Sequence, residues 1–592
     1  MIKLSIQSLI LIVALCLAGC GEKEVALSGK LTEAQSDQIK QYIVEQRSNG
    51  SSIDLKGIYG TNLKGLKLIN VNLSGVDLSG VDLSEAEIDR VNFSNANLKN
   101  IMVAGAAMID SDFSGVNFNS LDAHGVYFQG SIFSNTSFVD SNLSNANFEE
   151  SYFKEVKIKN SKLDSINLKN AHMENMTIDD VDFQRANLVS INLSGSNIKN
   201  TGFFGVDIRD ANISKSTVHG CSFESSDLSG TKIQDVKFIK TDFAQGIMNQ
   251  VGLVDVSFEE ADFSHVSMKN SILNNVSFNK GCLLKNTSMV NSNFMNTSMQ
   301  DSVLEDTKFL GSKISKLVLE NIKGKNNGFQ GAAINDMKVS NSVIENSIFE
   351  NGNGVKLSFA DVDLRGAQFD NYNFEDSSFY KTNLLESIFR NSKIQRVSFS
   401  SSQLNKIAII NCDFQSALFN NSPIKNSQVR SVDGIAIVII NSPFVRNIIF
   451  NNKGFSRVVS STNIANMEDL FATKNLSNLN MSYLDLSKIN ISETNFQESI
   501  LVGTKFNDAV LRNCKFIDSD LRNADFTKTS LFGTEIINSK LSGAKFLNTD
   551  LSSTKLEYLD FTRASIANIL LDQARINNVT GIDLVKQDSN AN

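Results

Sequence analysis

The residues of this chain that could do chemistry are few and scattered. The four histidines, at positions 124, 172, 219 and 265 of 592, are far apart, and no pair has the spacing of metal ligands. Adjacent acids such as Glu149 and Glu150 stand beside no base with which they could act. No phosphate-binding loop, nucleophile elbow or HExxH motif is present in the sequence. We therefore expect no enzyme activity, no metal and no cofactor.

One cysteine, Cys20, has a predicted chemical role. Lys3 is followed by an apolar run over residues 9–16, which is too short to span a bilayer. The run ends in Leu17-Ala18-Gly19-Cys20, which resembles the lipobox of bacterial lipoproteins. That resemblance implies that residues 1–19 are a signal peptide and that the Cys20 thiol carries a diacylglycerol. An ordinary signal peptide or a buried apolar segment is the alternative.

Localisation follows from the same resemblance. In enterobacterial sorting an Asp after the lipidated cysteine favours the inner membrane, and Gly21 therefore indicates an outer membrane lipoprotein. Residues 20–32 would be the lipidated cysteine and its tether. Three acyl chains would attach the protein firmly, because two lipid signals already give stable anchoring. The sequence leaves open whether the protein faces the periplasm or the cell surface.

Most of the chain after residue 52 repeats one five-residue pattern, which is clearest over 71–98. Each repeat has a small residue, then Asp, Asn or Glu, then a large apolar residue, then two mostly polar residues. The large residue recurs over 53–283, then with its phase moved by one over 284–449, and in a third phase over 476–576. Such a short period predicts a solenoid rather than several globular domains.

The pattern resembles the pentapeptide-repeat family, whose consensus is Ala-(Asp/Asn)-Leu-X-X. Ala96-Asn97-Leu98, Ala186-Asn187-Leu188 and Ala524-Asp525-Phe526 are close matches. The resemblance implies an all-β solenoid, a right-handed quadrilateral β-helix with four pentapeptides per coil. In an extended chain the large residue and the residue two before it share one side. We therefore expect large and small side chains to alternate in the interior.

Cysteines and glycines within the repeat are interpreted from the same pattern. Cys221, Cys412 and Cys514 lie two residues before a large Phe, and Cys282 lies one before Leu283. They are predicted to be buried small residues rather than disulfides or metal ligands. Gly occupies the large position at 324, 354 and 434, which predicts loosely packed coils. Asn351 to Gly354 is predicted to be a turn, with too few carboxylates for a calcium loop.

The two ends of the solenoid need covering. Thr32 and Gln35 form a capping-box pattern, and apolar residues follow at helical spacing, so we expect a helix over 33–47 within a cap of 33–52. This helix would cover the first coil; a membrane-surface helix is disfavoured by the mixed charge of its polar face. The tail, 577–592, would cap the last coil or, as the family resemblance implies, form an end-to-end homodimer.

The largest break in the pattern lies over 434–475. Apolar residues there occupy outward positions: Ile435, Val438, Ile440, Val445, Ile448 and Phe450. The stretch 450–475 is predicted to be an insertion with a short helix, in which Ile464, Met467 and Leu470 share one face. Two interpretations remain open: the helix covers the apolar stripe, or the stripe binds a partner, which would be an unidentified envelope protein.

The net charge of the chain distinguishes a DNA mimic from a scaffold or interaction module. Some members of the family act on DNA gyrase as acidic mimics of DNA, and this is the alternative function. The net charge is −8, and residues 53–288, with 20 Lys+Arg against 28 Asp+Glu, contain all of it. DNA carries about one charge per 1.7 Å, far more than this chain. We therefore expect no nucleic-acid partner or mimicry, and predict a lipid-anchored scaffold or protein–protein interaction module.

Overall fold

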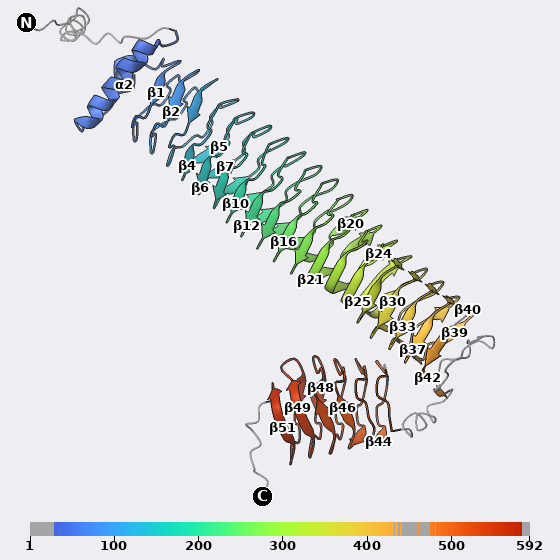
Figure 1. The fold of residues 1–592 in the computed structure, drawn as a ribbon. Coiled ribbons are helices and arrows are strands. Elements are labelled where there is room, and N and C mark those ends of the chain that lie inside the picture. Colours follow the sequence, from blue (N-terminus) through green and yellow to red (C-terminus); the bar gives the residue numbers. More distant parts are fainter. Residues whose placement is uncertain are drawn as a thin grey trace, which may run out of the picture. The chain divides into compact units, whose positions relative to one another are not determined.

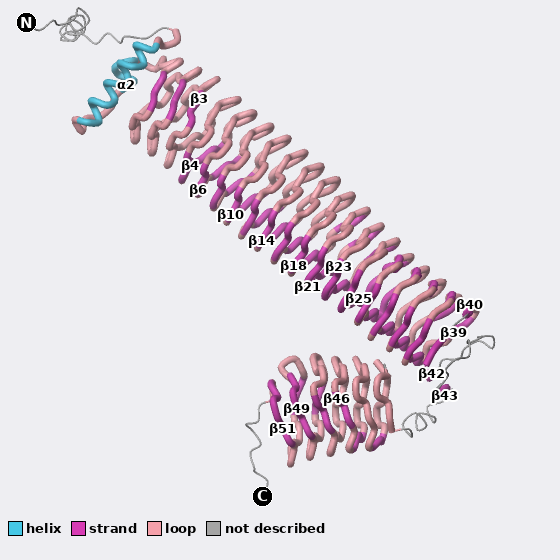
Figure 2. Tube along the Cα trace, in the orientation of Figure 1, coloured by secondary structure: helices cyan, strands magenta, loops and turns pink. Residues whose placement is uncertain are grey.

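The computed structural model describes residues 29–428, the backbone of 429–430, 433–435, 438–440 and 459–461, and residues 474–582 except 480 and 483. The chain divides into two compact units, Met1–Gly252 and Leu253–Asn592, and each is described by itself. Each unit is a stack of coils made of short strands and tight turns, and a helix precedes the first coil (Figure 1, Figure 2). The predicted β-solenoid is confirmed.

Each coil consists of four pentapeptides, as the pairing of the strands shows. In the first unit β1 (Lys67–Ile69) pairs in parallel with β2 (Glu87–Asp89), and β6 (Tyr152–Lys154) pairs with β8 (His172–Glu174). In both pairs the partner lies four pentapeptides further along the chain. Most strands are this short, because the chain turns a corner in every pentapeptide. The longest, β25 (Ala333–Glu345) in the second unit, continues through two corners.

The interior is built from the two apolar positions of the repeat. Val71 and Leu73 are 6% and 1% exposed, whereas Asn72 between them points outward. Large side chains from successive coils stack on one another; the rings of Phe93, Phe113 and Phe133 are nearly parallel with centroids 5.2 and 5.3 Å apart. The alternation of a large and a small residue therefore fills a narrow core, as the extended-chain argument predicts.

The last residue of each pentapeptide turns the corner in the left-handed backbone region. Asn70, Glu85 and Asn95 have φ of 55°, 56° and 57°. Asn, Asp and Gly tolerate this conformation best, which explains their abundance in the sequence. Corner amides also hydrogen-bond from coil to coil: Asn160 Nδ2 donates to Asp140 Oδ1 at 3.2 Å.

The predicted helix is α2 (Glu33–Ser48), and its capping box is present. Ile39 and Ile43 are fully buried, and the Ser36 hydroxyl accepts a hydrogen bond from the Lys67 backbone N–H at 3.1 Å. The helix therefore covers the first coil. The repeat was expected to start at residue 53, but residues Leu55–Tyr59 form a short helix, α3, whose N-cap is Asp54. The coils begin instead at Asn62, which bridges Asp82.

The first phase change is a single extra residue, Gly281. Lys280 and Gly281 have successive positive φ values of 55° and 90°, and Leu273 pairs with Phe294, one residue beyond the regular offset between coils. Leu284, rather than Leu283, is the large inward residue, and Cys282 takes the small inward position. The boundary predicted at 283/284 thus lies a few residues late, because glycine permits an extra residue at the corner.

Strand pairing continues into the second break. β38 (Leu418–Asn420) pairs with β42 (Val438–Ile440), which pairs with β43 (Val459–Ser461). β43 lies inside the stretch that was predicted to be an insertion. The helix predicted around Ile464 lies outside the described residues. The third run of coils is described from 474, with a first bridge between Asn475 and Asn495.

Candidate interaction surfaces

Most of the predicted site residues lie outside what the structure describes. Cys20, Val445, Ile448 and Phe450 are among them. Ile435 belongs to β41 (Asp433–Ile435), and Val438 and Ile440 belong to β42, but only their backbone is described. The apolar stripe over 435–450 therefore stays a prediction, in both of its interpretations.

Gly354 does not loosen the core. Tyr372, at the small inward position of the next coil, is fully buried, and its ring fills the space above the glycines. A Cβ atom on Gly354 would lie 3.0 Å from the ring of Tyr372, and one on Gly352 would lie 2.7 Å from it. A Cβ atom on Gly354 would also lie 2.5 Å from Leu357 Cδ1, so the tyrosine and this leucine together supply the missing volume. The expectation of a loose coil and a turn is wrong here: Asn353–Val355 is strand β27.

Gly324 is compensated in a similar way by Asn327. A Cβ on Gly324 would lie 3.1 Å from Asn327 Nδ2, and that amide donates to the Leu304 carbonyl at 3.0 Å. Asn327 is 1% exposed. The signal was present in the sequence, because both Asn327 and Tyr372 are unusually large for the small inward position. These breaks in the code are packing solutions, and neither forms a site.

The four cysteines of the described coils are packed in the interior. Cys221, Cys282, Cys412 and Cys514 are buried and unpaired, as predicted. Burial raises the pKa of each thiol to about 11, so that the nucleophilic thiolate is scarce at neutral pH. Within the described residues, no group of His, Cys, Asp and Glu side chains could hold a metal ion. Burial therefore leaves these thiols with packing as their role.

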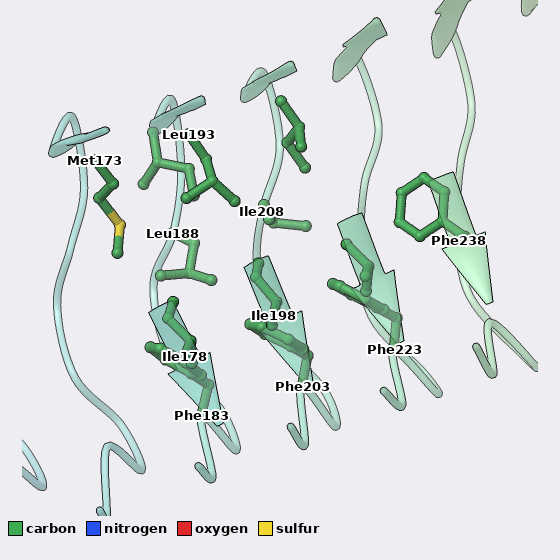
Figure 3. Close-up of a pocket in the computed structure, with 13 residues that line it drawn as sticks. Met173, Ile178, Phe183, Leu188, Leu193, Ile198, Phe203, Ile208, Phe223 and Phe238 are labelled. Carbon is green, nitrogen blue, oxygen red and sulfur yellow. The ribbon is translucent and has the colours of Figure 1, made fainter. Parts of the chain in front are cut away.

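A small apolar void lies in the interior of the first unit. Figure 3 shows its lining, in which aliphatic side chains such as Ile198 and Ile208 alternate with the stacked rings of Phe183, Phe203 and Phe223. Ring centroids lie 5.0 and 4.4 Å apart along this stack. The void holds about 20 Å³, and its lining has no polar surface. A void of this size and polarity stays dry and is too small for a ligand.

Surface charges of the first unit pair between coils. Lys159 lies 3.2 Å from Asp179, Lys169 lies 3.6 Å from Glu149, and Lys67 lies 3.0 Å from Glu87. The acidic stretch therefore carries cations among its carboxylates, unlike a phosphate backbone.

The four histidines lie on separate coils, twenty or more residues apart in the sequence. His172 stacks on Tyr152, with centroids 4.9 Å apart, and its Nδ1 hydrogen-bonds Asn192 at 3.0 Å.

Family models match more than half of the chain. The model described as "Pentapeptide repeat region" matches residues 131–213 and 355–429. The model described as "Pentapeptide repeats (8 copies)" matches 61–100, 96–135, 207–245, 475–508, 489–527, 504–536 and 529–566. The chain belongs to the pentapeptide-repeat family. Pentapeptide-repeat proteins are generally structural or interaction modules.

Solved structures of the family are similar to this pentapeptide-repeat chain at low identity. HetL of the cyanobacterium Nostoc sp. strain PCC 7120 is 14% identical, and the match covers 38% of this chain and 85% of HetL at a TM-score of 0.17. Rfr23 of the cyanobacterium Cyanothece 51142 is 20% identical, with 22% and 89% covered at 0.16. QnrB1, a plasmid-mediated fluoroquinolone resistance protein, is 19% identical, with 34% and 82% covered at 0.17. Because the TM-scores are this low, they support no functional argument. Among curated proteins there is no match.

One covered surface in the second unit does not follow from the repeat pattern. Ser398 and Ser400 point outward from β34 (Ser398–Ser400), yet both are fully buried. Their hydroxyls donate to the Ser482 carbonyl at 3.2 and 3.1 Å. Leu418, also outward, belongs to the same apolar cluster as Leu476. The signal was the lack of charge at these outward positions, which lets the start of the third segment pack against them.

The last described coil leaves its inward side chains half-buried. Ile566, Ile569, Ile576 and Val579 pack against the preceding coil on one side only. β51 (Arg575–Thr580) pairs with β49 (Lys555–Asp560), and no described strand follows it. This end therefore differs from the first coil, which α2 covers.

None of the described helices is long and apolar enough to cross a membrane.

Proposed function

We propose that this pentapeptide-repeat protein is a non-enzymatic, lipid-anchored scaffold or protein–protein interaction module of the bacterial cell envelope. The observation that carries the proposal is the Leu17-Ala18-Gly19-Cys20 sequence, placed shortly before the segment that covers the first coil. Lipidation of Cys20 would attach the chain to the outer membrane. The tether to Leu31, which is buried against the first coil, would extend at most about 40 Å.

The stripe over 435–450 is the proposed contact for an envelope protein. Its apolar residues lie where the repeat otherwise places polar ones, which marks either an interaction site or a self-covered surface. A photo-crosslinking amino acid at position 438, in intact cells, distinguishes the two. The proposal expects a crosslink to one envelope protein that is lost in the Cys20→Ser variant; the same label at exposed Thr217 is the control.

Two other crosslinking results at position 438 would each support a different interpretation. A crosslink only to residues 464–471 of the same chain would show that the predicted helix covers the stripe, and would remove this partner site. A crosslink to gyrase would support the alternative, the acidic DNA mimic. That alternative is disfavoured by the mild net charge of −8 and by the cations paired among the carboxylates of the first unit.

We also propose that two copies meet through their last coils. The half-buried inward side chains Ile566, Ile569 and Ile576 are the support, because no described strand or helix packs over them. Sedimentation of the purified chain is expected to show a dimer for the native protein and a monomer for Ile569→Lys. A native monomer would contradict the proposal; Leu570→Lys, at an outward position, is the matched control.

A further inference from the structure

A hollow of about 540 Å³ lies on the surface of the third run of coils. Its lining comes from three successive coils. The middle coil contributes the short side chains Asn538 and Ser542. Longer side chains stand on either side: Arg522 from the coil before, and Tyr558 and Arg563 from the coil after. The middle coil also contributes Lys540, and the short Asn538 and Ser542 leave room between the longer side chains. The volume of the hollow is in the range of small-ligand sites.

Tyr558 has an unusual place in the fold. It is a corner residue with φ of 54°, and among the described corner residues it is the only one with a phenyl or phenol ring. A bulky residue in the left-handed region costs free energy that Asn or Gly avoids. Tyr558 is also 57% exposed. The ring of Tyr558 therefore neither favours the backbone conformation nor packs in the core. It lies at the edge of the hollow, where it can contact a ligand.

The charges in the hollow are unevenly compensated. Arg522 forms a two-point ion pair with Asp520, at 2.8 and 2.9 Å. Lys540 and Arg563 form no salt bridge within hydrogen-bonding range among the described residues. Arg563 nevertheless lies near Asp560, because hydrogen bonds from Thr562 and Thr580, together with the charge of Arg563, lower the pKa of that carboxyl. Carboxylate oxygens are also present, from Asp518, which accepts from Asn538 Nδ2 at 2.6 Å, and from Asp560. The hollow thus combines an exposed ring, two cations that form no salt bridge among the described residues, and several hydrogen-bonding groups.

We propose that this hollow binds an acidic saccharide, of the uronic-acid type. A sugar presents a C–H face that can lie on an aromatic ring, hydroxyls that donate to carboxylates, and, in a uronic acid, a carboxylate. Tyr558 would take the C–H face, Lys540 and Arg563 the carboxylate, and Asp518 the hydroxyls. The inference rests on the geometry of residues 518–563 and does not depend on the lipid anchor.

Titration calorimetry of the full chain with trigalacturonic acid tests this site. The neutral trisaccharide maltotriose is the probe without a carboxylate, and inorganic phosphate is the probe without a sugar ring. We expect binding of trigalacturonic acid alone, weakened by added salt. Arg563→Ala and Lys540→Ala are each expected to weaken it about tenfold or more. Lys528→Ala, an exposed corner lysine outside the hollow, is the matched control.

The Tyr558→Asn variant separates binding from folding. Asn is the commonest kind of corner residue, so the substitution is expected to keep or raise the thermal midpoint while abolishing binding. Several results would overturn the proposal: no binding of trigalacturonic acid, equal binding of maltotriose, equal binding of phosphate, or full binding by Tyr558→Asn. Each excludes an acidic saccharide held by this ring and these cations.

Discussion

The fifth residue of each repeat has a backbone conformation that few residue types adopt without cost. Asn, Asp, Gly and Ser dominate there, yet Glu85, Arg90 and Lys215 also have φ near 50°. Because such charged residues also occur at the fifth position, the sequence indicates only that this position is polar. It does not indicate that the backbone there is left-handed. The inward positions follow another rule, because the side chains of each coil must together fill the same interior volume. Tyr372, which packs against Gly352 and Gly354, is the clearest example.

Substitution of Tyr372 tests that volume argument. Its hydroxyl is buried and has no hydrogen-bond partner among the described residues. Tyr372→Phe keeps the ring and is expected to leave the stability unchanged or raise it by about 1 kcal/mol. Tyr372→Ala is expected to lower it by about 3–5 kcal/mol, because neither glycine can fill the cavity. Denaturant unfolding measures both, with exposed Tyr127→Phe as control; equal losses for Phe and Ala would contradict the account.

Among the elements, those with strong local signals were predicted well. Thr32 and Gln35 marked the start of α2, and the spacing of Ile39 and Ile43 marked its buried face. α3 was missed because Ile53 and Ile58 continue the five-residue spacing, although Asp54 is an N-cap. The position of the first phase change was placed late because Leu283 and Leu284 are both large, and only the φ values of Lys280 and Gly281 distinguish them.

Deletion of Gly281 tests the phase-change account. The residues after it keep their own inward and outward order, so the deletion should leave a regular coil of four pentapeptides. We expect stability within about 1 kcal/mol of the native protein. Deletion of the corner residue Asn291 is the matched control, because it shortens a regular side and misaligns its inward residues. Hydrogen exchange over 283–310 should accelerate only in the control; acceleration in both would contradict the assignment.

On the scale of the whole molecule, the fold was predictable because one physical rule recurs in every coil. The sites were less so. The stripe from Ile435 to Phe450 lies largely outside the described residues. The contact of Ser398 and Ser400 with Ser482, and the hollow around Tyr558, join positions whose proximity follows only from the stacking of coils. A periodic sequence thus predicts its core well and its surface poorly.

The stability of the whole protein is expected to fall in acid. A hydrogen bond from Lys56 lowers the pKa of Asp77 to about 2, and Lys325 and Lys474 lower the pKa values of Glu305 and Glu493. Because these folded pKa values lie below those of the unfolded chain, the stabilisation is present above about pH 4 and is lost as the pH falls through the folded values. Thermal midpoints should be level from pH 5 to 8 and lower at pH 3. A higher midpoint at pH 3 would contradict this.

Membrane attachment through Cys20 is the central claim, because it separates an envelope scaffold from a cytoplasmic mimic of DNA. The direct measurement is labelling of cells with radioactive palmitate, followed by fractionation, for the native protein and for Cys20→Ser. Globomycin, which blocks cleavage of lipoprotein signal peptides, provides the control for processing. We predict a labelled native protein in the outer membrane fraction and an unlabelled Cys20→Ser variant. An unlabelled native protein in the cytoplasm would contradict the account.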